Sequence, residues 1–333
     1  MTLSTDNMKS FRALLGTALM GLVCSTLSGC ASSNSIPPAD EGLPAVLSNA
    51  PVSLMITAEL TSNIFGKPLD GPSAIRQSRD GFVYVIDHGN QRVLKFDEEL
   101  VALAERGGLG SFKGMFKDPQ ALALASSGWV YVADAELLSI QRFDSDLNVG
   151  DEIVYVDDED GLKYGRPAGL AVSVDNDVWV VDRDRARIAV FDRFHNFKEF
   201  FADYNSGGVR LERPGAAITL PDRRIAVCDT EAGRVVVYDE FGTERFTFGE
   251  NILREPADIA YDLSRRFWVI DRKLEEALCF SLSGGLLFRS GQLTSASHFR
   301  LTRPSGICAL DAETLLISDS GANRIIKVKV FSL

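Results

Sequence analysis

Six aspartates recur along the chain, and each lies 15 residues after a proline. The prolines are Pro72, Pro119, Pro167, Pro214, Pro256 and Pro304, and the aspartates are Asp87, Asp134, Asp182, Asp229, Asp271 and Asp319. Four aspartates are followed five residues later by an arginine: Arg92, Arg187, Arg234 and Arg324. Paired carboxylates and guanidinium groups can serve catalysis, but they can also fix a loop through backbone N–H bonds and an ion pair. Because these residues recur in almost every copy, we expect a structural role for them.

Two residues break the repeat in one copy only and are therefore stronger candidates for function. The second residue after the proline is small in five copies, as Ala74, Ala121, Gly169, Ala216 and Gly306, which suits close packing. Asp258 takes this position in the fifth copy, and Arg76 interrupts a series of alanine, isoleucine and cysteine four residues after the proline. We expect Asp258 and Arg76 to be binding residues. Ser139 and Glu276 replace the repeated arginine, so we expect their loops to differ.

The chain has only three histidines, so a histidine metal centre would need all of them. His88, His195 and His298 occupy different positions of the repeat, which indicates separate surface histidines and disfavours a shared zinc. His88 follows a repeated aspartate and is kept as a candidate binding residue. The acidic run DDEDG at 157–161 offers oxygen ligands for calcium but lacks the spacing of an EF-hand loop. We expect a solvated loop and no resident cofactor, with calcium as the alternative.

The composition narrows the classes of function. Of 333 residues, 45% are hydrophobic and 24% are charged, which is ordinary for a globular protein. The formal net charge is −11, from 46 acidic and 35 basic side chains. Nucleic-acid binding needs a basic surface. We therefore expect no nucleic-acid partner.

Residues 1–29 have the features of an export signal. Lys9 and Arg12 precede an apolar stretch, from residue 13 to about residue 23, that is too short for a stable transmembrane helix. The signal ends in Leu27-Ser28-Gly29-Cys30, which resembles a bacterial lipobox. An ordinary secretory signal with a chance cysteine is the alternative.

The lipobox resemblance implies that Cys30 is acylated and becomes the first residue of the mature chain, whether translation starts at Met1 or Met8. Two or three acyl chains anchor a protein stably, so we expect the membrane as a partner. Ala31 stands where an aspartate would resemble an inner-membrane retention signal. The expected location is the bacterial cell envelope, on the outer membrane facing the periplasm. Residues 30–50 are small, polar and proline-containing, which predicts a flexible tether.

The segments around the repeated aspartates predict β-strands. An apolar run follows each proline, and a second run ends at the aspartate, as FVYVID, WVYVAD, VWVVD, RIAVCD, FWVID and LLISD. A third run ends nine residues after the aspartate on Phe96, Phe143, Phe191, Tyr238, Phe280 or Val328, and a fourth follows, such as ERFTF at 244–248. Four strands in each unit of about 45 residues are typical of a β-propeller blade.

Six copies predict an all-β, six-bladed propeller over residues 51–333. The sixth copy ends after its third strand, and VSLMITAEL at 52–60 is the expected fourth. The N-terminal strand would then complete the last blade and close the ring without an open edge. Cys228, Cys279 and Cys308 lie in apolar runs, which predicts buried thiols.

The units resemble NHL repeats, most clearly in GRPAGLAVSVDNDVWVVDRDRARIAVFD at 165–192 and RPSGICALDAETLLISDSGANRIIKV at 303–328. The resemblance implies the propeller fold but no single function, since NHL propellers include enzymes, RNA binders and scaffolds. In amidating lyases of this kind, histidines directly after the blade prolines bind zinc. Those positions here hold Ser73, Gln120, Ala168, Gly215, Ala257 and Ser305. Lactonase-type propellers hold calcium with channel carboxylates, a role for which Asp258 is a candidate.

The loops predict two faces of different charge. Loops between strands 1 and 2 and between strands 3 and 4 are mostly acidic. Loops between strands 2 and 3 and between blades carry most of the arginines: Arg166, Arg183, Arg185, Arg213, Arg272 and Arg303. We expect the second face to bind a partner, with Arg183 and Arg272 as candidate binding residues. The alternative is that both faces are only solvated.

These expectations favour a membrane-anchored scaffold of the cell envelope that recognises an envelope protein or an anionic glycan. The alternative is a metal-dependent hydrolase or lyase, similar to lactonases, acting in the central channel. A sensor of small ligands would need an aromatic-lined channel, whereas the aromatic residues here mostly occupy positions expected to be core.

Overall fold

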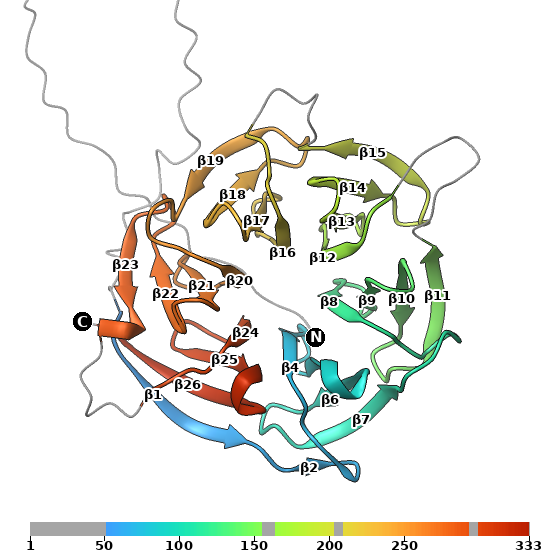
Figure 1. Cartoon of the computed structure of the whole chain (residues 1–333), viewed down its shortest axis with the longest axis horizontal. Helices are drawn as coiled ribbons and strands as arrows, with labels where there is room; N and C mark the ends of the chain where they lie inside the picture. Colours follow the sequence, from blue (N-terminus) through green and yellow to red (C-terminus); the bar gives the residue numbers. More distant parts are fainter. Residues whose placement is uncertain (1–50, 155–163, 203–208, 293–298, 333) are drawn as a thin grey trace, which may run out of the picture. The chain divides into compact units, whose positions relative to one another are not determined.

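The computed structural model describes residues 51–154, 164–202, 209–292 and 299–332, which form six four-stranded antiparallel sheets arranged as a ring (Figure 1). The export signal, Cys30 and the tether at 30–50 lie outside the described residues, as do the acidic run at 157–161 and His298. Within the described part of the chain, no helix combines the length and the apolar character needed to cross a membrane.

Blades 1 to 5 place their strands in chain order from the channel outward. Blade 1 holds β4 (Pro72–Gln77), β5 (Val83–Asp87), β6 (Arg92–Phe96) and β7 (Ala102–Gly107). Blade 2 holds β8 (Pro119–Leu124), β9 (Val130–Asp134), β10 (Ser139–Phe143) and β11 (Val149–Val154). Blade 3 holds β12 (Pro167–Val172), β13 (Val178–Asp182), β14 (Arg187–Phe191) and β15 (Phe197–Phe201). Blade 4 holds β16 (Pro214–Thr219), β17 (Ile225–Asp229), β18 (Arg234–Tyr238) and β19 (Glu244–Phe248). Blade 5 holds β20 (Pro256–Tyr261), β21 (Phe267–Asp271), β22 (Glu276–Phe280) and β23 (Leu286–Arg289).

The ring closes in blade 6, where strands from the two ends of the propeller pair. Its order is β24 (Pro304–Ala309), β25 (Thr314–Asp319), β26 (Arg324–Ser332) and β1 (Pro51–Leu60). The antiparallel register sets Leu54 against Val330 and Ile56 against Val328. The predicted six-bladed propeller and its closure by the N-terminal strand are confirmed. A short β2–β3 hairpin (Asn63–Ile64 and Lys67–Pro68), which the sequence did not predict, leads into blade 1.

The second strand of each blade is buried on both sides because neighbouring blades cover both faces of the sheet. Every residue of β5, β9, β13, β17 and β21 is buried, which explains the continuous apolar runs. The residues nine positions after the repeated aspartates are also buried: Phe96, Phe143, Phe191, Tyr238, Phe280 and Val328. The first five end their strands, whereas β26 continues past Val328 to Ser332. Cys228, Cys279 and Cys308 are buried free thiols, as predicted.

The innermost strands approach one another closely around the channel. A Cβ atom on Gly169 of β12 would lie 2.0 Å from the carbonyl oxygen of Gly215 on β16, and one on Gly306 of β24 would lie 2.1 Å from that of Ser73 on β4. No side chain fits at such distances. The small residue two positions after the proline therefore permits close packing at these two contacts between blades.

Candidate functional site

The repeated aspartates end the second strands and fix the loops on one face of the ring. In blades 2 and 5, which lack the repeated arginine, Asp134 and Asp271 each accept four backbone N–H bonds of 2.6–3.1 Å. The donors come from the loop that enters the blade and from the loop that follows the aspartate. The carboxylate thus satisfies backbone groups that have no partner in the sheet.

In the other four blades a guanidinium supplies part of this bonding. The Nε–carboxylate distances are 2.7 Å for Arg92–Asp87, 3.3 Å for Arg187–Asp182, 3.1 Å for Arg234–Asp229 and 2.9 Å for Arg324–Asp319. All six aspartates are buried. Their carboxylate oxygens accept hydrogen bonds from the neighbouring loops and arginines, which indicates a structural role. Glu276 in blade 5 pairs instead with Arg289, at 2.9 and 3.0 Å.

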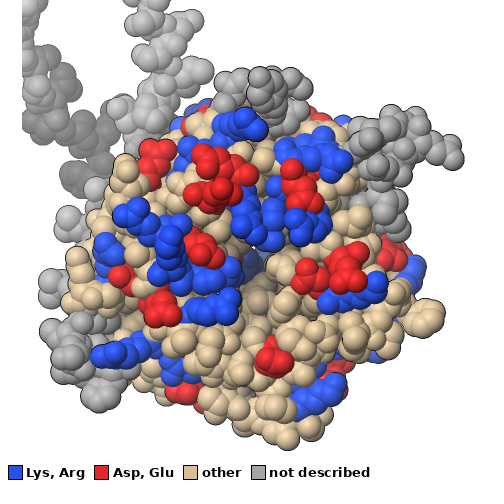
Figure 2. Space-filling view, viewed as in Figure 1, with Lys and Arg blue, Asp and Glu red and all other residues tan. Residues whose placement is uncertain are grey.

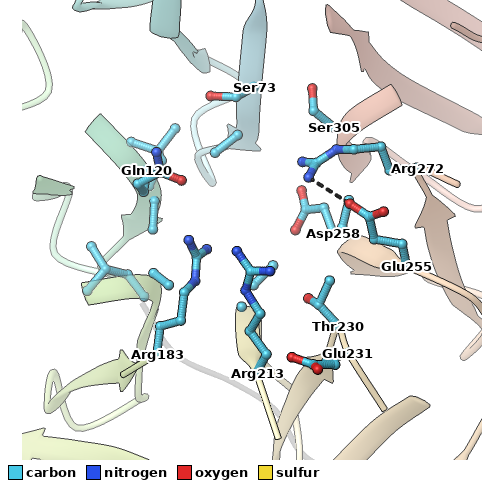
Figure 3. Close-up of a pocket in the computed structure, with 18 of the residues that line it drawn as sticks. Ser73, Gln120, Arg183, Arg213, Thr230, Glu231, Glu255, Asp258, Arg272 and Ser305 are labelled. Carbon is cyan, nitrogen blue, oxygen red and sulfur yellow. Dashed lines mark hydrogen bonds and ion pairs between the residues drawn. The ribbon is translucent and has the colours of Figure 1, made fainter. Parts of the chain in front are cut away.

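The main candidate site is a cavity of about 470 Å³ at the mouth of the central channel, within the 300–1,000 Å³ typical of small-ligand sites. Inner strands supply its walls, and the loops between second and third strands and between blades supply its rim. Figure 3 shows the polar and charged residues that converge on it: Ser73, Gln120, Arg183, Arg213, Thr230, Glu231, Glu255, Asp258, Arg272 and Ser305. None of its lining residues in the described chain is aromatic.

Arg76 and Asp258, the two residues that break the repeat, form an ion pair in the wall of this cavity. The guanidinium of Arg76 donates two hydrogen bonds to the Asp258 carboxylate, at 2.8 and 2.9 Å. Asp258 also accepts the N–H groups of Ile259 and Ile307, at 2.9 and 3.0 Å. The pair therefore joins blades 1 and 5 to β24 of blade 6. Burial acts to lower the pKa of Arg76, and the Asp258 charge outweighs it and raises that pKa.

This pairing corrects the expectation that Arg76 and Asp258 bind a ligand directly. The Asp258 side chain is 3% exposed, and both of its oxygens are occupied by donors of the protein. A carboxylate neutralised in this way is a poor ligand for calcium. The geometry favours a structural role for both residues.

Arg183 and Arg213, unlike Arg76, form no ion pair in the described structure. Arg183 follows Asp182 at the end of β13, and Arg213 precedes Pro214 at the start of β16. Their guanidinium groups extend into the cavity side by side (Figure 3). Among the described residues, neither guanidinium has a hydrogen-bond or ion-pair partner. Burial and then the like charges of Arg213 and Arg166 lower the pKa of Arg183.

Further basic residues surround the mouth. Arg254 and Lys273 line the same cavity, and Arg303 lines a neighbouring cavity of about 330 Å³. Arg272 lines both cavities, and its guanidinium pairs with Glu255 at 3.2 Å. Figure 2 shows lysine and arginine side chains gathered around the central hollow, with acidic groups among them. Six of the lining side chains of the larger cavity are basic and three are acidic, so this surface is positive although the whole chain is acidic.

His88 lies at the edge of the smaller cavity and is not an isolated histidine, contrary to the sequence-based expectation. Its Nε2 is 2.8 Å from Asp118 Oδ1 in blade 2, and Gln120 donates to the same oxygen at 2.6 Å. The hydrogen bond to Asp118 raises the pKa of His88 despite its partial burial. The same bond lowers the pKa of Asp118. The pair bridges blades 1 and 2, which are consecutive in the chain, through two residues 30 positions apart.

The acidic residues of the opposite face mostly stabilise turns. Asp97, Asp144, Asp192 and Asp239 follow third strands, and each accepts backbone N–H bonds from residues two and four positions later. Arg266, in the loop between β20 and β21, is buried and pairs with Asp262 at 2.7 Å. Much of the charge on this face therefore has a local structural partner. No group of three histidine, cysteine, aspartate or glutamate residues in the described ranges is arranged to hold a metal ion.

Comparison with known proteins supports the repeat and the fold. The NHL repeat family matches residues 164–191, which span blade 3 from its entry loop to the end of β14. The chain is a six-bladed β-propeller that carries an NHL repeat. No curated protein matches the chain.

Solved structures of the same fold include two named lyases. Streptogramin B lyase is 12% identical with a TM-score of 0.57, over 84% of this chain and 98% of that chain. An inactive variant of virginiamycin B lyase from Staphylococcus aureus with quinupristin is 15% identical with a TM-score of 0.59, over 84% of this chain and 100% of that chain. These identities establish a similarity of fold alone.

Sequence reasoning assigned Arg183 and Arg272 to the arginine-bearing face and kept His88 as a candidate binding residue, but it did not single out Arg213 or Asp118. Arg213 was one of six arginines in a charge pattern, and only the structure separates those with a carboxylate partner from those without one. Arg166, for example, is exposed and pairs with Asp184 at 2.8 Å. The His88–Asp118 contact joins two blades, so no local motif could have predicted it.

Proposed function

We propose that this protein is an envelope-bound recognition protein that binds an anionic group of a partner or ligand at the channel mouth. The observation that carries the proposal is the Arg183–Arg213 pair, whose guanidinium groups have no hydrogen-bond or ion-pair partner among the described residues, in a positive cavity of an otherwise acidic chain. Arginine forks bind carboxylate and phosphate groups with two parallel hydrogen bonds. The partner is an envelope protein or an anionic glycan.

Anchoring through Cys30 forms the second part of the proposal, and it rests on the lipobox resemblance at residues 27–30. Acyl chains on this cysteine would hold the propeller at the membrane, with residues 30–50 as a tether. Confinement near a partner in the same envelope raises the effective concentration of the binding face. Substituting Cys30→Ser is expected to move the protein from the membrane fraction to the soluble fraction of the envelope.

Photo-crosslinking of the full-length protein in its host tests which face binds. A photoreactive residue would replace Lys273, which lines the cavity, and in a matched variant Phe241, which is 77% exposed on the opposite face. The proposal predicts discrete adducts from position 273 that disappear when Arg183 and Arg213 are changed to glutamine. Adducts from position 241 alone, or from neither position, would contradict it.

A hydrolase or lyase acting at the channel mouth is the second candidate, and the His88–Asp118 pair favours it. A histidine oriented by a carboxylate beside a cavity has the composition of a general base. The solved structures of similar fold include a lyase with quinupristin bound. Consumption of quinupristin by the full-length protein, lost in the His88→Gln variant, would support this candidate. No consumption above a protein-free control would argue against this activity.

A further inference from the structure

The Arg183–Arg213 pair is held in place by the structural part of the repeat. The N–H of Arg183 donates to the carbonyl of Arg166 at 3.1 Å. The N–H of Arg213 donates to the buried carboxylate of Asp229 at 3.0 Å, and its carbonyl accepts the N–H of Thr230 at 3.1 Å. The backbone of both arginines is therefore fixed by loop bonds in blades 3 and 4, and only the side chains remain free to bind.

Close packing between blades 3 and 4 brings the two arginines together. Gly169 and Gly215 face each other across β12 and β16 at a distance that excludes any side chain. The two guanidinium groups consequently share one sector of the cavity (Figure 3). Two like charges at such a place repel each other unless an anion lies between them.

The other charges of the cavity do not neutralise this pair. Asp258 is occupied by Arg76, and Glu255 is paired with Arg272. Glu231 is the one remaining acidic residue in the described lining, and it is exposed and forms no ion pair with either arginine. The pair therefore presents two positive charges to the ligand.

We propose that Arg183 and Arg213 form a clamp for a doubly charged oxyanion, either a terminal phosphate group or two adjacent carboxylates. This inference rests on the proposed function, because it names the chemical group that the channel mouth would recognise. Two planar donor forks match the oxygens of such a group, and a dianion cancels both charges, which a single carboxylate cannot do.

The rest of the lining indicates a hydrophilic carrier for this anion. Ser73 has a buried hydroxyl without a hydrogen-bond partner in the described structure, and it lines both cavities. Gln120 and Ser305 also line both cavities, so a ligand longer than one anionic group can extend from the clamp toward Arg303. The absence of aromatic side chains from the described lining of the larger cavity disfavours a ligand that binds by stacking.

Calorimetric titration of the full-length protein in detergent, at constant ionic strength, tests the clamp. The probes are inorganic phosphate, malonate as a pair of carboxylates, and acetate as a single carboxylate. We expect phosphate or malonate to bind at least about tenfold more tightly than acetate, because only a dianion meets both guanidinium groups. Binding of phosphate alone or of malonate alone would identify the source of the charge.

Variants separate the clamp from general surface charge. Arg183→Gln and Arg213→Gln are each expected to weaken binding of the dianion by about tenfold or more. Arg79→Gln is the matched control, since Arg79 is an exposed arginine of the β4–β5 loop on the opposite face. Equal binding of acetate, no binding of either dianion, or equal losses in all three variants would overturn the clamp.

The outcomes also distinguish this inference from the proposed function. Partner adducts at position 273 that depend on both arginines, combined with no dianion binding, would retain the recognition face and reject the clamp. Dianion binding that requires both arginines, combined with no adducts at position 273, would retain the clamp and reject the partner.

Discussion

The cavity contains two arrangements of arginine that differ in their partners. In its wall, Arg76 is 15% exposed and makes a two-bond ion pair with Asp258 that also holds a strand of a third blade. At its rim, Arg183 and Arg213 lie side by side, and neither guanidinium has an ion-pair partner in the described chain (Figure 3). The first arrangement is neutralised within the protein, and we propose that the second is neutralised by an anion from outside.

This difference shows that a residue can depart from the repeat for a structural reason and need not bind a ligand. Asp258 and Arg76 depart from the repeat because they compensate each other across the ring. Arg183 and Arg213 lie at loop positions whose residue type differs from blade to blade, and we propose them as the binding residues. A charge in a channel indicates a ligand only when the protein itself does not neutralise it.

Removal of one member of the buried pair is expected to have the largest effect on stability. The Asp258→Ala substitution leaves the guanidinium of Arg76 buried without its counter-charge and the N–H of Ile307 without an acceptor. We expect a loss of about 3–5 kcal/mol in the free energy of unfolding, measured by denaturant titration. A loss below about 1 kcal/mol would show that the wall pair is not structural.

Removal of both members is expected to restore most of that loss. In the double variant Arg76→Ile with Asp258→Ala, blades 1 and 5 carry residue types that other blades have at these positions. No unpaired buried charge remains at this site, so we expect the free energy of unfolding to lie within about 1–2 kcal/mol of the original protein. Additive losses from the two single variants would contradict a coupled pair.

Neutralisation of a rim arginine is expected to change the free energy of unfolding only slightly, and to raise it where Asp258→Ala lowers it. Arg183→Gln or Arg213→Gln removes repulsion between like charges without breaking an ion pair, since neither guanidinium has one in the described structure. The free energy of unfolding should stay constant or rise by up to about 0.5 kcal/mol at low salt. A loss of more than about 1 kcal/mol would reveal a structural role for the rim pair and weaken the comparison.

The two described histidines provide a test by pH. The contact with Asp118 should place the pKa of His88 above its ordinary 6.5, whereas burial and then Arg142 should place that of His195 below 6.5. The stabilisation from charged His88 is complete below pH 6.5 and is lost as the pH rises through its raised pKa. The stabilisation from the ionised Asp118 carboxylate is present above pH 3.8, and it is lost as the pH falls through the lowered pKa of Asp118.

Titration of both histidines by NMR would check these directions. In the Asp118→Asn variant the pKa of His88 should fall, while that of His195 should not change. An unchanged His88 pKa would show that the 2.8 Å contact does not control its charge.

Much of the fold could be predicted from the sequence because the same pattern of strands and loops recurs in all six blades. Each blade has a proline, a buried second strand and an aspartate that bonds its loops, so Asp134 and Asp271 end their second strands as Asp87 does. The closure of the ring by β1 followed from counting strands. The β2–β3 hairpin did not follow, because it occurs once and has only two residues in each strand.

The site was less predictable, because its contacts join blades that are far apart in the chain. Arg76 and Asp258 are 182 residues apart, and their pairing depends on the closed ring. The sequence indicated which residues are unusual and which face is basic. It could not indicate which arginines form ion pairs, since Arg166 and Arg183 occupy loops of the same face, and in the described structure only Arg166 pairs with a carboxylate.

The most direct test of the recognition face compares two charge-neutralised forms of the full-length protein for partner binding in the host envelope. One form carries Arg183→Gln and Arg213→Gln at the channel mouth, and the other carries Arg79→Gln and Arg193→Gln on the opposite face. Both remove two positive charges, so the net charge is matched. We predict that partners cross-linked to the original protein are lost in the first form and retained in the second. Retention in the first form, or equal loss in both, would contradict the assignment of the channel mouth as the binding site.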